Sequence, residues 1–65
     1  MLNQLYLKRV CCRLTQQQLA DLSGVSRRTI CRLEAGSLPT FGVAVRLCRA
    51  LCCSLEEVFP SDVLL

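Results

Sequence analysis

Apolar residues along this chain recur at intervals of three and four positions, which is the spacing of one face of an α-helix. No stretch of strict apolar–polar alternation is long enough to predict a β-strand. Capping residues, glycines and prolines divide the pattern into separate segments. The pattern therefore predicts an all-α fold, with one compact five-helix domain in residues 1–60 and a short C-terminal tail in residues 61–65.

Start and stop signals give each of these helices its expected bounds. Thr15 with Gln18 has the spacing of a capping box, in which two side chains satisfy free backbone groups at the start of a helix. Ser54 with Glu57 repeats that spacing. Gly36 suits the left-handed residue that follows a helix end. The predicted segments are, in chain order, Leu2 to Cys12, Thr15 to Ser23, Ser26 to Gly36, Thr40 to Leu51, and Ser54 to Pro60.

The third segment separates apolar from cationic residues. At about 100° per residue, Ile30 and Leu33 point one way and Arg28 points almost directly opposite. A charge run on a helix is commonly a solvated face, but solvated faces usually mix opposite charges at i, i+4. Here the outward positions are all cationic or neutral, and such a ridge fits the major groove of DNA, where arginine can bond guanine edges. Cys31 and Arg32 flank Arg28 on this ridge, and Arg27 lies nearer the side.

The segment TQQQLADLSGVSRRTICRLEAG, residues 15–36, resembles the helix-turn-helix of the phage repressor and Cro-like family, often called XRE-type. Ala20 is small where two helices cross, and Gly24 can supply the positive φ of the turn. The resemblance extends to LCRALCCSLEEVF and so covers nearly the whole chain. It implies a repressor-like fold and a transcriptional regulator that binds double-stranded DNA sequence-specifically. The other positions at the family's spacing are Gln16, Val25, Ile30 and Leu33.

The resemblance also implies contacts to DNA. Gln16 matches a glutamine that contacts a phosphate and supports a recognition side chain. Thr40 and Phe41 match the start of a helix whose N–H groups can hold a phosphate. The recognition helix, Ser26 to Ala35, is expected to lie in the major groove. Its residues that match base-reading or backbone-holding positions are Ser26, Arg27, Arg28 and Arg32.

Two further features bear on stability. Arg9 and Glu34 match a partly buried ion pair that ties the first helix to the end of the third. Glu34 lies at the edge of the apolar face, where a carboxylate needs a partner. Arg13 and Cys52 stand where family members often carry glycine. Because a side chain disfavours the left-handed conformation, those two helix ends are expected to be built differently.

Six cysteines in a chain of 65 residues would suggest a disulfide scaffold in a secreted protein. No secretory signal pattern and no apolar run near the ~20 residues of a membrane span is present. We therefore expect a soluble, cytoplasmic protein with reduced thiols and no membrane contact. The cysteines form no C-x₂-C pair and no histidine is present, so neither a metal site nor a cofactor is expected. They are predicted to be small buried hydrophobes, with Cys31, among the arginines, as the exception.

The sequence contains no set of nucleophile, base and orienting group and no Gly-rich phosphate loop, so no catalysis is expected. The net charge of +3 is mild, and the placement of the arginines carries more information than their number. Family members usually bind as homodimers on two-fold related half-sites. A homodimer is expected here because the apolar residues of the first helix exceed what one small core needs. Two other functions stay open, namely an antitoxin-like protein-interaction module and a cysteine-based redox- or metal-responsive regulator.

Overall fold

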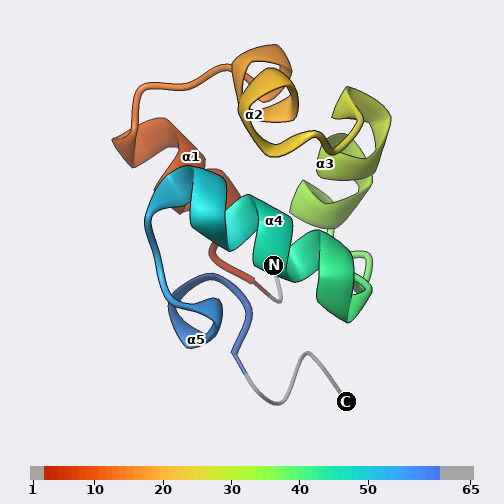
Figure 1. Cartoon of the computed structure of the whole chain (residues 1–65). Coiled ribbons are helices and arrows are strands. Elements are labelled where there is room, and N and C mark those ends of the chain that lie inside the picture. The colour runs from red at the N-terminus through yellow and green to blue at the C-terminus, as the bar shows by residue number, and fades with distance from the viewer. Residues whose placement is uncertain (1–2, 61–65) are drawn as a thin grey trace.

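The structure, a computed structural model, describes residues 3–60. Its helices, in chain order, are α1 (Leu5–Cys11), α2 (Gln16–Ser23), α3 (Arg27–Glu34), α4 (Phe41–Leu51) and α5 (Leu55–Val58). No strand occurs among these described residues, and the prediction of an all-α, five-helix fold is confirmed. Figure 1 shows α4 crossing the middle of the molecule, with α2 and α3 above it and α5 below. Leu2 and the predicted tail, residues 61–65, lie outside the described residues.

Side-chain caps fix the starts of four helices. The hydroxyl of Thr15 accepts a hydrogen bond from Gln18 N at 3.0 Å, and Gln18 Oε1 accepts one from Thr15 N at 2.8 Å. The same reciprocal pair joins Ser54 and Glu57, at 3.3 and 2.9 Å. Both predicted capping boxes are therefore confirmed. The bond from Ser54 N to the carboxylate of Glu57 lowers the pKa of that group. The other two caps are Ser26 and Thr40, as predicted.

The first helix is shorter than predicted, since it begins at Leu5 rather than at Leu2. Asn3 Oδ1 accepts a hydrogen bond from Leu5 N at 3.0 Å, and Asn3 Nδ2 donates to Leu33 O at 2.9 Å. Asn3 is only 2% exposed. Its side chain thus satisfies one backbone donor at the start of α1 while holding this segment against α3, and the helix begins after it.

Two helix ends that lack glycine are nevertheless left-handed. Arg13 has φ of 59° and Cys52 has φ of 55°. The expectation that these ends would be built differently is therefore wrong. Each side chain accepts a conformation that costs roughly 1–2 kcal/mol for a residue other than glycine. Gly24 and Gly36 also have positive φ, 74° and 114°, as their places after α2 and α3 predict.

The core is a single cluster to which every helix contributes. Leu19, Ile30 and Leu33 are buried together in this cluster, beneath the turn between α2 and α3. Phe59, directly after α5, is the largest fully buried side chain among the described residues, and its burial was not predicted from the sequence. Because Ile30 and Leu33 are buried, the opposite side of α3 faces outward. Within residues 3–60, the buried apolar residues are Leu5, Leu19, Ala20, Val25, Ile30, Leu33, Ala44, Leu47, Cys48, Leu51, Val58 and Phe59.

The cysteines depart from prediction. Cys48 is buried in the core, and burial raises the pKa of its thiol. Cys53 is intermediate, and Cys11, Cys12 and Cys52 are exposed, which contradicts the prediction that they are small buried hydrophobes. Cys31, the predicted exception, is exposed as expected. The exposed thiols lie at the C-terminal end of α1, on the outer side of α3 and just beyond α4, where no other helix covers them; they are Cys11, Cys12, Cys31 and Cys52.

None of the described helices has the length and apolarity needed to cross a membrane.

Candidate nucleic-acid interface

The outward side of α3 carries the cationic residues singled out in the sequence. Ile30 is fully buried and Leu33 is 2% exposed, whereas Arg27, Arg28 and Arg32 are all exposed. None of these three arginines forms an ion pair with a carboxylate within residues 3–60. The helix therefore presents three guanidinium groups to solvent. A polyanion could bind them without breaking any ion pair found within residues 3–60.

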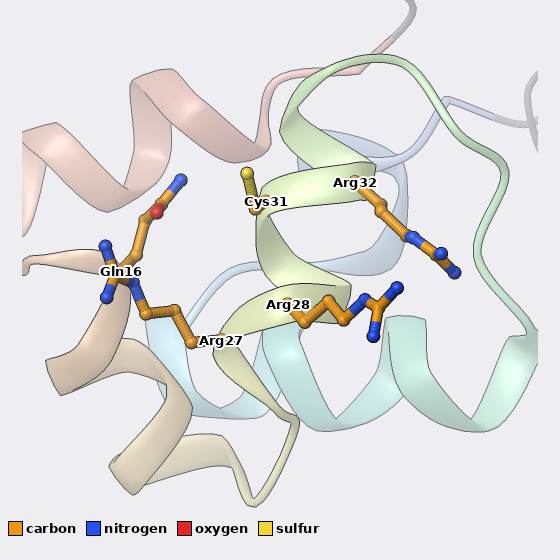
Figure 2. Close-up of a pocket in the computed structure, with 5 residues that line it drawn as sticks. All are labelled: Gln16, Arg27, Arg28, Cys31 and Arg32. Atoms are coloured by element: carbon orange, nitrogen blue, oxygen red, sulfur yellow. The ribbon is translucent and has the colours of Figure 1, made fainter.

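The three arginines do not point the same way. Figure 2 shows Arg28 and Arg32 extending to one side of α3, while Arg27 extends to the other side, toward Gln16. Cys31 lies between them. These five residues line an open depression of about 480 Å³. The site thus has an arginine pair on one flank and an arginine–glutamine pair on the other.

A second depression adjoins the first at its Gln16 and Arg27 flank. Its lining includes Arg9 from α1 together with Thr15, Gln16 and Gln17 from the start of α2, and Arg27 from α3. Gln16 and Arg27 are common to both depressions. This half of the site is therefore built from three helices, and its geometry depends on how α1, α2 and α3 are joined.

An ion pair supplies that joint. Arg9 Nε donates to Glu34 Oε2 at 2.6 Å, and Arg9 Nη2 donates to Glu34 Oε1 at 3.1 Å. Arg9 Nη1 also donates to Leu14 O at 2.7 Å, and the guanidinium carbon lies 5.3 Å from the centre of the Tyr6 ring. The hydrogen bonds to Glu34 raise the pKa of Arg9. The side chains are only 12% and 9% exposed, so the pair is largely removed from water.

Gln16 belongs to the same network. Its Nε2 donates to Glu34 Oε1 at 3.1 Å. The family resemblance implied a phosphate contact for Gln16 and assigned Glu34 to a separate, structural ion pair with Arg9. In the structure the carboxylate of Glu34 contacts both Arg9 and Gln16. Spacing alone does not reveal this link, because the contact joins residues 18 positions apart in different helices.

The remaining predicted residues, Ser26, Thr40 and Phe41, do not line either depression. The hydroxyl of Ser26 accepts from Thr29 N at 3.2 Å and contacts Thr29 Oγ1 at 2.9 Å, so it is engaged in capping α3. Thr40 caps α4 through Val43 N at 3.3 Å. Phe41, the first residue of α4, is 70% exposed. Neither Thr40 nor Phe41 lines the two depressions around Gln16 and Arg27.

Comparison with known proteins agrees with this architecture. A helix-turn-helix family model matches residues 6–58, a range that includes every candidate DNA-contacting residue. An uncharacterized HTH-type transcriptional regulator of Bacillus subtilis (strain 168), YgzD, is 33% identical over 46 residues, which cover 69% of this chain and 70% of that protein. The capped α2, the left-handed Gly24 after it and the outward arginines of α3 agree with this match. The chain therefore belongs to the XRE-type helix-turn-helix family of DNA-binding domains.

Proposed function

We propose that this domain is a transcriptional regulator that binds double-stranded DNA sequence-specifically, with α3 in the major groove. The observation that carries the proposal is the division of α3 into a buried side, with Ile30 and Leu33, and an outward side with three exposed arginines. A helix of this kind fits the width of the major groove, and arginine is the residue that most often reads guanine there. Family membership supports the same assignment.

The arginines divide the work between reading bases and holding backbone. Arg28 lies in the first turn of α3, opposite the buried side, and reads a guanine with two hydrogen bonds. Arg32 extends to the same side one turn later, and in this arrangement it would lie next to the bases that follow. Arg27 extends toward Gln16, and this pair holds the adjacent phosphates. The hydroxyl of Ser26 is engaged in its cap, so its contribution to binding is to set where α3 begins.

The start of α4 provides a further phosphate contact. Thr40 caps the third residue of this helix, Val43, and leaves the N–H groups of Phe41 and Gly42 for an outside acceptor. The partial positive charge at a helix start favours an anion there. This contact would lie outside the arginine cluster and would orient the domain on the duplex without reading a base.

The domain binds as a homodimer on two-fold related half-sites. Support comes from α1, where Tyr6, Leu7 and Val10 are 42%, 53% and 47% exposed. Three exposed apolar side chains on one short helix are suited to an interface between two copies of the domain. Sedimentation of the domain with and without duplex DNA tests this part of the proposal, since a monomer in both conditions would contradict it.

Selection from a pool of random duplexes tests the function as a whole. The expected result is enrichment of a two-fold symmetric motif with a conserved guanine in each half-site. Binding without enrichment would contradict sequence-specific recognition, although the domain would still bind DNA. Absence of any duplex binding would favour the antitoxin-like alternative, in which the fold holds another protein.

A further inference from the structure

Glu34 is hydrogen-bonded and largely buried at the contact between α1 and α3. Its two carboxylate oxygens accept hydrogen bonds from Arg9 at 2.6 and 3.1 Å, and its side chain is only 9% exposed. Arg9 itself is fixed by Leu14 O at 2.7 Å and by the ring of Tyr6 at 5.3 Å. A group bonded to this carboxylate is therefore attached to a rigid joint between α1 and α3.

Gln16 is the group attached to that joint. Its Nε2 donates to Glu34 Oε1 at 3.1 Å, while its side chain lines the depression that also holds Arg27, Arg28 and Arg32. An ionised carboxylate only accepts hydrogen bonds, so the amide nitrogen of Gln16, and not its carbonyl oxygen, must face Glu34. The carbonyl oxygen and the second N–H of Gln16 are left for the DNA-facing side of the domain.

We propose that Glu34 is a positioning residue for DNA binding, acting through the side-chain amide of Gln16. The inference rests on the proposed function and adds a role to the ion pair. Glu34 fixes which atoms of Gln16 face a phosphate and the neighbouring guanidinium of Arg27 before DNA arrives. A long side chain ordered in advance loses less freedom on binding, and this lowers the cost of association.

Charge distinguishes this role from a general electrostatic one. Glu34 is a carboxylate near a site for a polyanion, so its neutralisation alone should strengthen DNA binding or leave it unchanged. Loss of positioning should weaken DNA binding. The Glu34→Gln variant, which keeps the shape of the side chain, therefore gives effects of opposite sign under the two explanations.

A double-mutant cycle measures the positioning effect directly. The dissociation constants of a fluorescent duplex are compared for the wild-type chain, Gln16→Ala, Glu34→Gln and the double variant, at a temperature where circular dichroism shows all four folded. Glu34→Gln is expected to weaken binding about two- to tenfold when Gln16 is present. In the Gln16→Ala background it should leave binding unchanged or slightly strengthened. Equal weakening in both backgrounds, or no weakening in either, would overturn the inference.

Asn3→Ala serves as the matched control, because Asn3 also ties α1 to the end of α3 but forms no hydrogen bond with Gln16. It should lower stability while leaving the affinity of the folded domain for DNA unchanged. If both Asn3→Ala and Glu34→Gln weaken binding alike, Glu34 acts only through the fold and the inference fails. A wild-type chain that binds no duplex would instead overturn the proposed function, and this inference with it.

A second measurement needs no variant at Glu34. NMR relaxation of the side-chain amides should show Gln16 Nε2 more rigid than Nε2 of Gln17, which is exposed and bonds only to the exposed Asp21 in the described structure. Order comparable to that of the backbone is expected for Gln16. Equal mobility of the two amides in the free domain would overturn the inference, even if Glu34→Gln failed to fold.

Discussion

Asn3 Nδ2 donates a hydrogen bond to the main-chain oxygen of Leu33 over 2.9 Å, across 30 residues of chain. The same side chain accepts from Leu5 N at 3.0 Å. Asn3 therefore supplies the start of α1 and the last turn of α3 with one partner each. This buried amide therefore contributes to the stability of the packing between α1 and α3.

Replacing Asn3 by alanine is expected to destabilise the domain by about 1–3 kcal/mol, because Leu33 O and Leu5 N would lose a buried partner. Urea unfolding followed by circular dichroism measures the change. Gln4→Ala is the control, since Gln4 is exposed and makes no side-chain cap bond, and it should change stability by no more than about 0.5 kcal/mol. Equal effects of the two changes would show that the Asn3 bonds contribute little.

Local signals predicted most of this fold, and contacts between distant segments were predicted poorly. Thr15 and Ser54 could be recognised as N-caps because a capping box joins residues only three positions apart. The stripe in α4 of Ala44, Leu47, Cys48 and Leu51 is likewise visible as a spacing, and all four residues are buried. The role of Asn3 depends on a carbonyl in another helix, and no local pattern encodes that distance.

The same limit applies to the site. Spacing alone separated the inward and outward residues of α3 and placed Arg27 to the side of Arg28, but it did not predict that Gln16 bonds to Glu34. The cysteines were misjudged because a small apolar residue fits equally well on a covered or an uncovered helix face. Arg13 and Cys52 show that a left-handed helix end does not require glycine. Directly after them, Leu14 N donates to Arg9 O and Cys53 N donates to Cys48 O, so both helix ends are still closed by backbone hydrogen bonds.

The ion pair between Arg9 and Glu34 should contribute more to stability than an exposed pair. Its side chains are 12% and 9% exposed, so Arg9→Ala would leave a carboxylate poorly solvated and without its main partner. We expect a loss above the ~0.2–1 kcal/mol measured for exposed pairs. Lys8→Ala is the control, because the Lys8–Glu57 contact is longer, 3.8 Å, and its side chains are 35% and 53% exposed. A denaturant midpoint lowered equally by both changes would contradict this ranking.

The thiols should react with alkylating reagents at rates that follow their exposure. The thiolate is the reactive form, and burial raises the pKa of Cys48, so less thiolate is present at neutral pH and reaction there should be slow. Exposed Cys31 should react readily. Mass spectrometry of peptides after timed alkylation measures both rates, and all cysteines should react alike in urea. A Cys48 that reacts as fast as Cys31 in the folded domain would contradict the burial seen here.

Alkylation of Cys31 also tests the interface. Its thiol lies between the arginines in Figure 2, so a bulky adduct should obstruct the groove-facing side of α3 and weaken DNA binding. Cys31→Ser should bind DNA normally and should resist this loss when treated with the same reagent. Loss of binding in the treated Cys31→Ser variant would show that alkylation of another cysteine causes the loss. Reversible loss on mild oxidation, abolished by Cys31→Ser, would favour the redox-responsive alternative.

Salt dependence should report the phosphate contacts. If the domain neutralises several phosphates, the logarithm of the binding constant should fall linearly with the logarithm of salt concentration, with a slope of about −0.9 for each contact. Fluorescence anisotropy with one duplex over a range of potassium chloride concentrations gives the slope. An affinity that stays constant between low and moderate salt would argue against DNA as the partner. Gln16→Ala should leave the slope unchanged, because the side chain carries no charge.

Arg28 should be the principal base reader, because it lies in the first turn of α3 on the side opposite the buried Ile30 and Leu33. Arg28→Ala is expected to cost about 1–3 kcal/mol per half-site and to relax the preference at one base position. Arg27→Ala should instead weaken binding to all sequences alike and reduce the salt slope by about one, because Arg27 extends toward Gln16 on the phosphate-holding flank.

Binding of each variant to the selected site and to duplexes changed at every base pair separates the two roles. A base reader loses affinity mainly for the preferred base, so the difference between matched and mismatched duplexes shrinks at one position only. A phosphate contact lowers every affinity by the same factor, because the backbone is common to all sequences. If Arg28→Ala lowers all affinities equally, Arg28 holds only backbone, and base reading must come from Arg27 or Arg32.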